Sequence, residues 1–467
     1  MTQVPIISGI YADTTPDYRT AYPLNLVPIP KVTGVSEGYL RVADGVEANG
    51  TGPGVTRGGI EWRGVCYRVM GSKFVSVAAD GTVTTIGDVG AGGTVSMTYG
   101  FSYLAIASAG NLWLYDGTTL AQNVDPDLGT VLDVEWVDGY FMTTDGENLV
   151  VTELGNPFAV NPLKYGSSEV DPDPVVAVVR LRKEAYAINR HTIETFTNVG
   201  GNFFPFQVIT GAQVFRGAVG THAVTTFLDG IAFVGSGRNE AVGVYIASGG
   251  GSQKISTREI DQVLAGYTET ELSDLVLEVK VDEGQQILYI HLANDTLCFD
   301  GLGSQALGQP VWYVLSSSVD GVGPYKAIHH VRAYNKWLVG HTASTAIGHL
   351  VKDVSTHWGE TVVWEFTTPI VYNEGKSVMI HALELQALNG SAAFGSLALI
   401  NHTYSDDGVN WSMPRRISLG SAGDRTKPIK WARLGMFRQQ RMLRFSGDSN
   451  APISIARLDA ELEAMAW

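Results

Sequence analysis

Paired apolar runs that recur at a long period constrain the fold of this chain more than any other feature. Seven such pairs follow one another at intervals of 37 to 56 residues, and their first runs begin at Cys66, Tyr103, Tyr140, Glu184, Ile231, Ile287 and Lys336. A period of about 40–50 residues with several strands per unit is typical of propeller blades. A single β-sandwich rarely extends over so many strands. The sequence therefore predicts an all-β fold built on a β-propeller of about seven blades, with six or eight as alternatives.

Asp-Gly pairs punctuate these runs. They begin at Asp44, Asp80, Asp116, Asp138, Asp145, Asp229, Asp300, Asp320 and Asp407. A calcium site or a pair of catalytic acids would need several carboxylates to converge, whereas these are spread along the chain. Glycine adopts positive φ without cost and aspartate tolerates it, which suits the tight turns of β-hairpins. We interpret the pairs as turns.

The pattern of apolar runs divides the sequence into three parts. After about residue 355, runs such as "TVVWEFTTPIVY" and "MIHALELQAL" predict antiparallel strands of a separate β-sandwich. We expect an N-terminal arm and first strand over residues 1–57, the propeller over 58–355 and the sandwich over 356–467. The segment "ISTREIDQVLAGYTETELSDL" predicts a helical interruption between the fifth and sixth blades. Its capping-box pairs would be Ser256 with Glu259 and Thr268 with Glu271.

Charge and cysteine content exclude several classes of protein. The net charge of −15 argues against a sequence-reading DNA-binding protein, which would carry a basic balance. Cys66 and Cys298 lie in apolar runs and predict buried thiols in a reducing compartment rather than a disulfide framework. The N-terminal sequence lacks the features of a signal peptide, and no run reaches eighteen apolar residues. We expect synthesis in a cytoplasm and no membrane insertion.

No pattern indicates a catalytic, cofactor-binding or metal-ligating set. "NEGKSV" resembles the end of a P-loop but lacks its first glycine, because Ile370 stands there. "YSDDGVNW" resembles a sialidase-type Asp box with one residue too few, and it occurs once. The ten histidines show no zinc-binding spacing. His329 and His330 are expected on opposite faces of a strand, where they could not share one ion.

Two segments are unusual enough to be candidate interfaces. Phe203, Phe204 and Phe206 lie in a glycine-rich connector, where they either plug the propeller or form a contact patch. The segment from Ser412 to Arg444 has one acidic residue, Asp424, and nine basic ones, which are Arg415, Arg416, Arg425, Lys427, Lys430, Arg433, Arg438, Arg441 and Arg444. Such a segment is either a solvated face or a surface for an acidic partner or a nucleic-acid backbone.

The chain also resembles a known family, the packaged-DNA stabilisation proteins of short-tailed Salmonella-type phages (podoviruses), which form the tail hub. The resemblance begins with Tyr22-Pro23-Leu24-Asn25 and Gly38-Tyr39-Leu40-Arg41, followed by Asp44-Gly45 where the family has Pro-Gly. It continues through "TRGGIEWRGVCYRVMGSKF", "VSMTYG", "ILYIHLANDTLCFD" and "SDDGVNW…WARLG" over almost the whole length.

This resemblance implies a structural virion protein of the tail and no enzymatic activity or cofactor. Six copies would form a ring below the portal and its adaptor, extend the DNA channel without sequence-specific binding and retain the packaged DNA. The ring would dock tailspikes or tail-fibre adaptors and the tail needle, and assembly would take place in the bacterial host cytoplasm. The alternative is a propeller that binds or hydrolyses glycans at the host surface, which would need several Asp boxes or clustered carboxylates and aromatics at the propeller mouth.

Overall fold

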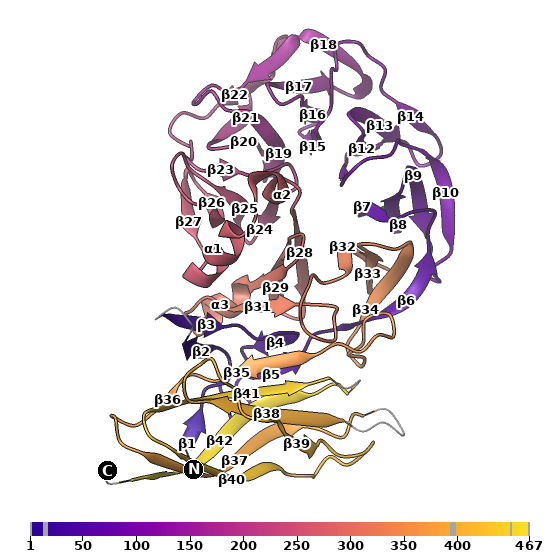
Figure 1. Cartoon of the computed structure of the whole chain (residues 1–467). Coiled ribbons are helices and arrows are strands. Elements are labelled where there is room, and N and C mark those ends of the chain that lie inside the picture. The colour runs from indigo at the N-terminus through magenta and orange to yellow at the C-terminus, as the bar shows by residue number, and fades with distance from the viewer. Residues whose placement is uncertain (1, 13–16, 393–397, 449–450, 466–467) are drawn as a thin grey trace.

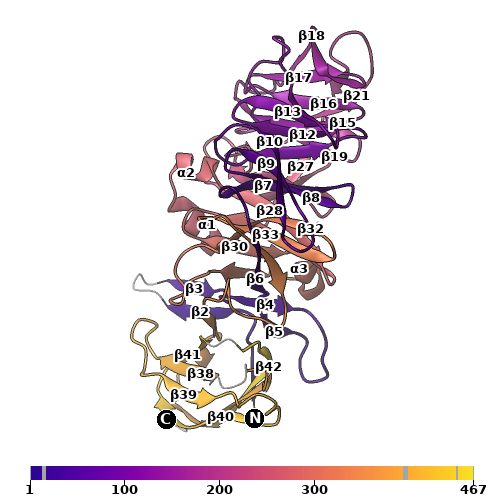
Figure 2. The same cartoon turned by 90° about the vertical axis from the view of Figure 1, so that its right-hand side faces the viewer.

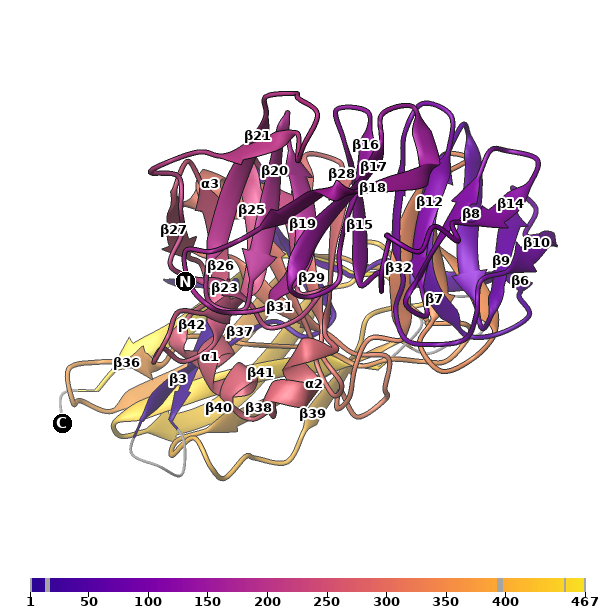
Figure 3. The ribbon, with the colours of Figure 1, turned by 90° about the horizontal axis from the view of Figure 1, so that it is seen from above.

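The computed structural model consists of a large β-propeller and a smaller β-sandwich that lies against its rim (Figures 1 and 2). It describes residues 2–12, 17–392, 398–448 and 451–465. Figure 1 looks along the propeller axis, with the sandwich below the disc. Figure 3, seen from above, shows the strands of neighbouring blades standing side by side.

Seven antiparallel sheets form the blades, and each begins with a strand at the centre of the disc. The first three blades are β7 (Thr56–Trp62), β8 (Val65–Met70), β9 (Lys73–Val77) and β10 (Val83–Asp88); β11 (Ser96–Tyr99), β12 (Leu104–Ser108), β13 (Asn111–Tyr115) and β14 (Leu120–Gln122); and β15 (Asp133–Val137), β16 (Tyr140–Thr144), β17 (Asn148–Glu153) and β18 (Asn156–Ser167). The fourth and fifth are β19 (Val175–Leu181), β20 (Glu184–Asn189), β21 (Ile193–Asn198) and β22 (Phe206–Val208); and β23 (Gly217–Ala218), β24 (Val224–Phe227), β25 (Gly230–Ser236), β26 (Gly243–Ser248) and β27 (Gly251–Lys254). The sixth and seventh are β28 (Val276–Asp282), β29 (Gln285–His291), β30 (Thr296–Asp300) and β31 (Trp312–Leu315); and β32 (Ala327–Ala333), β33 (Lys336–His341), β34 (Ala346–Val351) and β6 (Gly45–Thr51).

The prediction of about seven blades is confirmed. The seven apolar runs used to count them are the second strands of the blades: β8, β12, β16, β20, β25, β29 and β33. These strands are the most regular signal because neighbouring blades cover both of their faces. Strands β12, β16 and β25 are buried at every position. Such strands appear as continuous apolar runs rather than alternating ones.

The N-terminal segment closes the disc. Strand β6 is the outermost strand of the seventh blade and pairs with β34, with Val46 opposite Leu350. The chain then continues directly into β7 of the first blade. Residues from the two ends of the propeller sequence thus share one sheet, which removes the open seam between the first and last blades.

The sandwich contains two sheets, and both domains recruit strands from the first 51 residues. One sheet contains β1 (Thr2–Val4), β4 (Leu26–Ile29), β5 (Tyr39–Val42), β37 (Val378–Leu388), β40 (Ile429–Phe437) and β42 (Ser454–Ala464). The other contains β35 (Trp364–Thr367), β36 (Val371–Tyr372), β38 (Leu399–Ser405), β39 (Arg415–Ser418) and β41 (Gln440–Gly447). A separate hairpin joins β2 (Gly9–Ala12) to β3 (Tyr18–Ala21).

The helical interruption lies between the fifth and sixth blades as predicted, in two helices. Helix α1 (Arg258–Ala265) has Thr257 as its N-cap, not Ser256, and no side chain caps it. The Ser256 hydroxyl instead accepts the backbone N–H of Val244 at 3.0 Å. Helix α2 (Glu269–Ser273) has the expected capping box between Thr268 and Glu271.

Most of the Asp-Gly pairs are turns, and two are not. At Asp138-Gly139 both residues have positive φ, +47° and +95°, as a two-residue hairpin requires. Asp300, in contrast, is fully buried and is the N-cap of helix α3 (Gly301–Leu307), so the turn interpretation is wrong there. The Asp44 side chain is also buried, and its carboxylate accepts a hydrogen bond from the Lys280 ammonium group at 2.7 Å. Spacing alone does not separate a hairpin aspartate from a buried capping or ion-pairing one.

One motif of the N-terminal segment fastens the two domains together. Leu24 exchanges backbone hydrogen bonds with Glu365, at 2.9 and 3.1 Å. The next residue, Asn25, donates its backbone N–H to the carbonyl of Val314 in the sixth blade. The side chain of Asn25 is 1% exposed and donates to the carbonyls of Ser316 and Val363. The segment between Tyr22 and Asn25 therefore lies between the propeller and the start of the sandwich.

Candidate interaction surfaces

The basic segment forms the adjacent edges of both sandwich sheets. Strand β39 is the last strand of one sheet and β40 the last strand of the other. Each pairs with a neighbour on one side only among the described strands, so the two outer edges lie together at one margin of the sandwich (Figure 1). Exposed lysine and arginine are typical of sheet edges because charge prevents unspecific strand pairing.

Arg415 holds these two edges together. Its guanidinium donates to the backbone carbonyls of Ala432 and Arg433, both at 3.1 Å. Its own carbonyl accepts the indole N–H of Trp431 at 3.0 Å. The Arg415 side chain is therefore partly engaged in the fold, although the residue is exposed.

The remaining basic residues fall into two groups. Arg416, Arg425, Lys430, Arg433 and Arg438 are exposed, and Lys427 is half-buried. Arg441 is buried instead, and Arg444 is half-buried. Arg441 pairs with Asp406 at 2.7 Å, and Arg444 lies 3.7 Å from the ring centre of Trp411. The basic surface therefore consists of β39, β40, the loop between them and Arg438 directly after β40, and we call it the basic margin.

The three phenylalanines of the glycine-rich connector have different environments. Phe206 is 4% exposed and packs against Tyr140 of the third blade, with ring centres 5.8 Å apart. Phe204 is partly buried and packs on Phe196 and Phe206. Phe203 is 68% exposed. Two of the three rings therefore fill the space between blades, and Phe203 is the member that a partner could contact.

The structure adds an aromatic pair with one exposed ring that the sequence did not suggest. Phe101 is 85% exposed, and its ring meets Trp136 edge-on at 5.2 Å. Leu154 is also exposed and lines the same surface hollow as these two rings. Phe101 and Leu154 lie in turns of the second and third blades and Trp136 lies on β15, so no local pattern connects them in the sequence.

His329 and His330 both approach the carboxylate of Glu278, although adjacent residues of a regular strand face opposite sides. A bulge between Ile328 and Val331 interrupts the pairing of β32, and His329 has a φ of +58°. The expectation that His329 and His330 occupy opposite faces is therefore wrong. Both imidazoles approach the carboxylate of Glu278, with Nδ1–O distances of 3.5 and 2.6 Å.

Comparison with known proteins agrees with this two-domain architecture. Residues 2–355 match the family described as Bacteriophage P22 Gp10, beta-propeller, and residues 363–463 match Bacteriophage P22 Gp10, beta-sandwich. The chain therefore belongs to this family of phage structural proteins. A particular relative is the tail hub protein gp10 of Salmonella phage P22, with 26% identity over 486 residues and 99% coverage of both chains.

The family membership defines the role of the chain. It is a structural component of a phage virion tail, a tail hub, and the expected non-enzymatic role is confirmed. A tail hub contacts other proteins of the tail or portal. Among the described residues, no helix is both long and apolar enough to cross a membrane.

Solved structures show weaker likeness. PorZ of Porphyromonas gingivalis is 12% identical with a TM-score of 0.41, covering 79% of this chain and 46% of its own. The N-terminal domain of Nup159 is 8% identical with a TM-score of 0.41, covering 66% and 95%. Scores at this level do not bear on the function.

Proposed function

We propose that six copies of this chain form a ring below the portal and its adaptor, extend the DNA channel and retain the packaged genome. The full-length match to a tail hub carries this proposal, because it includes both domains and the segment that joins them. Asn25 of the matched Tyr22–Asn25 motif makes three side-chain hydrogen bonds between the domains. A fixed angle between disc and sandwich is what a ring subunit with several docking faces needs.

The basic margin is the surface we assign to a neighbouring tail protein, either the adaptor ring or the tailspike or fibre adaptor. The chain has a net charge of −15, so a cluster of exposed arginine and lysine side chains stands out electrostatically. Arg416 and Lys430 form no ion pair with a described residue, although Lys430 lies across from Glu384 in the ladder. Their charge is therefore available to an acidic partner, where complementary charge speeds association and fixes orientation.

Phe203 is a second candidate contact. Exposed aromatics are enriched at protein interfaces because they bury a large area with few rotatable bonds. Its position on the propeller, far in sequence from the sandwich, would place a different partner there, such as the tail needle or another subunit.

The net negative charge favours a channel through which DNA moves without sequence-specific binding.

The experiment is sedimentation of the purified chain with and without a purified portal–adaptor complex. The wild-type chain is expected to co-sediment with the complex. The double variant Arg416→Glu/Lys430→Glu is expected to bind at least tenfold more weakly, because four units of charge change at the basic margin. The matched control is Arg182→Glu/Lys183→Glu, which makes the same change of charge at the exposed β19–β20 turn.

Equal binding of all three proteins would exclude the basic margin as the adaptor contact. Failure of the wild-type chain to bind the complex, together with binding to host glycans, would favour the alternative of a glycan-binding propeller.

A further inference from the structure

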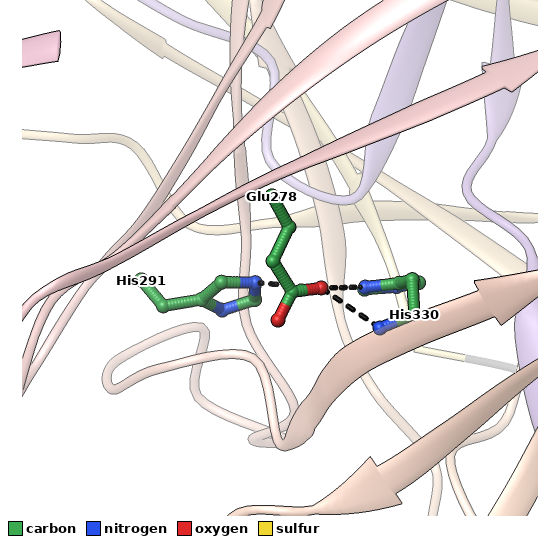
Figure 4. Close-up of side chains that lie close together, drawn as sticks. All are labelled: Glu278, His291 and His330. Carbon is green, nitrogen blue, oxygen red and sulfur yellow. Dashed lines mark hydrogen bonds and ion pairs between the residues drawn. The ribbon is translucent and has the colours of Figure 1, made fainter. Parts of the chain in front are cut away.

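Three ligand-forming side chains meet where the sixth and seventh blades touch (Figure 4). Glu278 lies on β28, the inner strand of the sixth blade, and His291 ends β29 of the same blade. His330 lies on β32, the inner strand of the seventh blade. Their ligand atoms all lie within 4.8 Å of one another. Figure 4 shows the two imidazoles on opposite sides of the carboxylate.

The backbone fixes the carboxylate at this position. Glu278 accepts the backbone N–H groups of His329 and His330, the latter at 2.9 Å, where the bulge in β32 leaves them without a strand partner. Tyr289 stacks on the His330 ring with ring centres 4.8 Å apart, and Tyr325 stacks on the same ring at 6.4 Å. The carboxylate and one imidazole are thus held in place by contacts that do not involve the second imidazole.

The second imidazole has no hydrogen-bond partner. His291 is 6% exposed, and neither its Nδ1 nor its Nε2 is hydrogen-bonded to a described atom. The Nε2 atom of His330 is also buried without a partner. Leaving a buried polar atom unpaired costs on the order of 1–3 kcal/mol, so such atoms call for an explanation. His291 lies against a carboxylate but is too far from it for a hydrogen bond, with Nε2 4.0 Å from Oε2.

The distances between the ligand atoms lie on either side of those found around a bound metal ion. Metal–nitrogen and metal–oxygen bonds of roughly 2.0–2.2 Å at tetrahedral angles put neighbouring ligand atoms roughly 3.2–3.6 Å apart. The observed distances from Oε2 are 2.6 Å to Nδ1 of His330 and 4.0 Å to Nε2 of His291. The ligand atoms of the two imidazoles are at most 4.8 Å apart, so binding requires all three side chains to draw together around the ion.

The site borders a surface pocket on its His291 side. His291 and His329 line one pocket with Thr56, Thr94 and Tyr325, on the face of the propeller where the sixth and seventh blades meet the first. We infer that Glu278, His291 and His330 bind a divalent transition-metal ion, zinc in the first place, which links the sixth blade to the seventh. Two imidazoles and one carboxylate suit zinc, whereas calcium and magnesium prefer sites made of oxygen ligands only.

This metal site does not depend on assembly of the tail hub. A metal bridge here would brace the blade that the N-terminal strand β6 closes. The ion would then hold the sixth and seventh blades together.

The test measures zinc bound by the full-length chain after dialysis against EDTA and readdition of zinc. Wild-type protein is expected to retain about one zinc ion per chain and to gain in melting temperature. His291→Gln is expected to lose both, whereas His402→Gln is expected to keep both. His402 is the matched control, because it is a fully buried histidine of the sandwich whose ring nitrogens also lack hydrogen-bond partners.

Cobalt absorption of the wild-type chain provides a measurement that needs no variant. Intense visible bands, typical of cobalt with four ligands, are expected at one equivalent and should disappear when zinc is added. Absence of these bands, or zinc binding by His291→Gln equal to that of wild type, would overturn the assignment. Loss of binding in His402→Gln would equally contradict it, because that residue lies in the other domain.

Discussion

The side chain of Asn25 and the backbone of Ser316 exchange two hydrogen bonds. The Asn25 amide donates to the Ser316 carbonyl at 2.9 Å, and its oxygen accepts the Ser316 N–H at 3.0 Å. The same amide donates to the carbonyl of Val363 at 2.7 Å. One buried residue of the N-terminal segment therefore contacts the end of the sixth blade and the chain that enters the sandwich.

Replacement of Asn25 by alanine is expected to destabilise the junction between the domains. The variant leaves buried N–H and carbonyl groups without partners, at a cost on the order of 1–3 kcal/mol. Urea unfolding measures the change in the free energy of unfolding. Because Asn25 has a φ of +52°, the control is Asn239→Ala, an exposed asparagine with a φ of +61°. Equal losses in both variants would assign the effect to backbone strain instead of the hydrogen bonds.

Removal of one partner of the buried ion pair between Asp44 and Lys280 is expected to destabilise the protein. Both side chains are less than 10% exposed, so Lys280→Met leaves a buried carboxylate with Arg41 alone at 3.1 Å. The expected loss of stability is about 3–5 kcal/mol, and adding Asp44→Asn should restore part of it. A Lys280→Met variant as stable as wild type in thermal and urea unfolding would contradict this assignment.

Asp44 also predicts a dependence of stability on acid. Burial raises its pKa, but Lys280 and Arg41 outweigh that effect and hold the pKa below its ordinary value. A carboxyl group whose pKa is lowered by folding stabilises the protein above its unfolded pKa of about 4, and this contribution is lost as the pH falls further. The acid-induced fall in unfolding free energy should therefore be shallower in Lys280→Met/Asp44→Asn than in wild type.

Glu135 predicts the opposite dependence. Burial raises its pKa to about 7, against the hydrogen bonds from Thr98 and the backbone of Trp136 that lower it. A carboxyl group with a raised pKa contributes stability at low pH that is lost as the pH rises toward 7. Glu135→Gln should therefore match wild type near pH 4 and exceed it at pH 8, by on the order of 1–3 kcal/mol. A constant difference across this range, measured by urea unfolding, would count against the raised pKa.

Two phenylalanines of the glycine-rich connector are expected to have different roles, Phe206 in the core and Phe203 at the surface. Phe206→Ala should cost about 3–5 kcal/mol of stability, because it removes a buried ring. Phe203→Ala should leave the stability within about 0.5 kcal/mol and weaken assembly if its exposed ring contacts a partner. Thermal unfolding gives the first comparison and sedimentation with purified tail proteins the second. Unchanged binding of Phe203→Ala to every tail protein would remove it as a contact.

The propeller could be predicted from the sequence because its signal is local and repeated. The second strand of each blade is buried on both faces and appears as a continuous apolar run, as in β16 and β25. The division into propeller and sandwich followed from a change in strand texture near residue 355. These features depend on residues close together in the chain.

What the sequence did not reveal depends on contacts between distant residues. The pairing of β6 with β34 and of β1 with β42 joins segments roughly 300 and 450 positions apart in the sequence, which no periodicity reports. The approach of His329 and His330 to Glu278 requires a bulge, and alternation in a regular strand predicts the opposite. The adjacency of the β39 and β40 edges likewise arises only from the stacking of two sheets.

The most direct test of the tail-hub assignment is DNA retention by phage particles that lack this chain. Packaged heads made without it are expected to lose their DNA to added nuclease. Addition of the purified wild-type chain, together with the remaining tail proteins, should restore nuclease protection and infectivity. Particles that keep their DNA and become infectious without the chain would contradict the account.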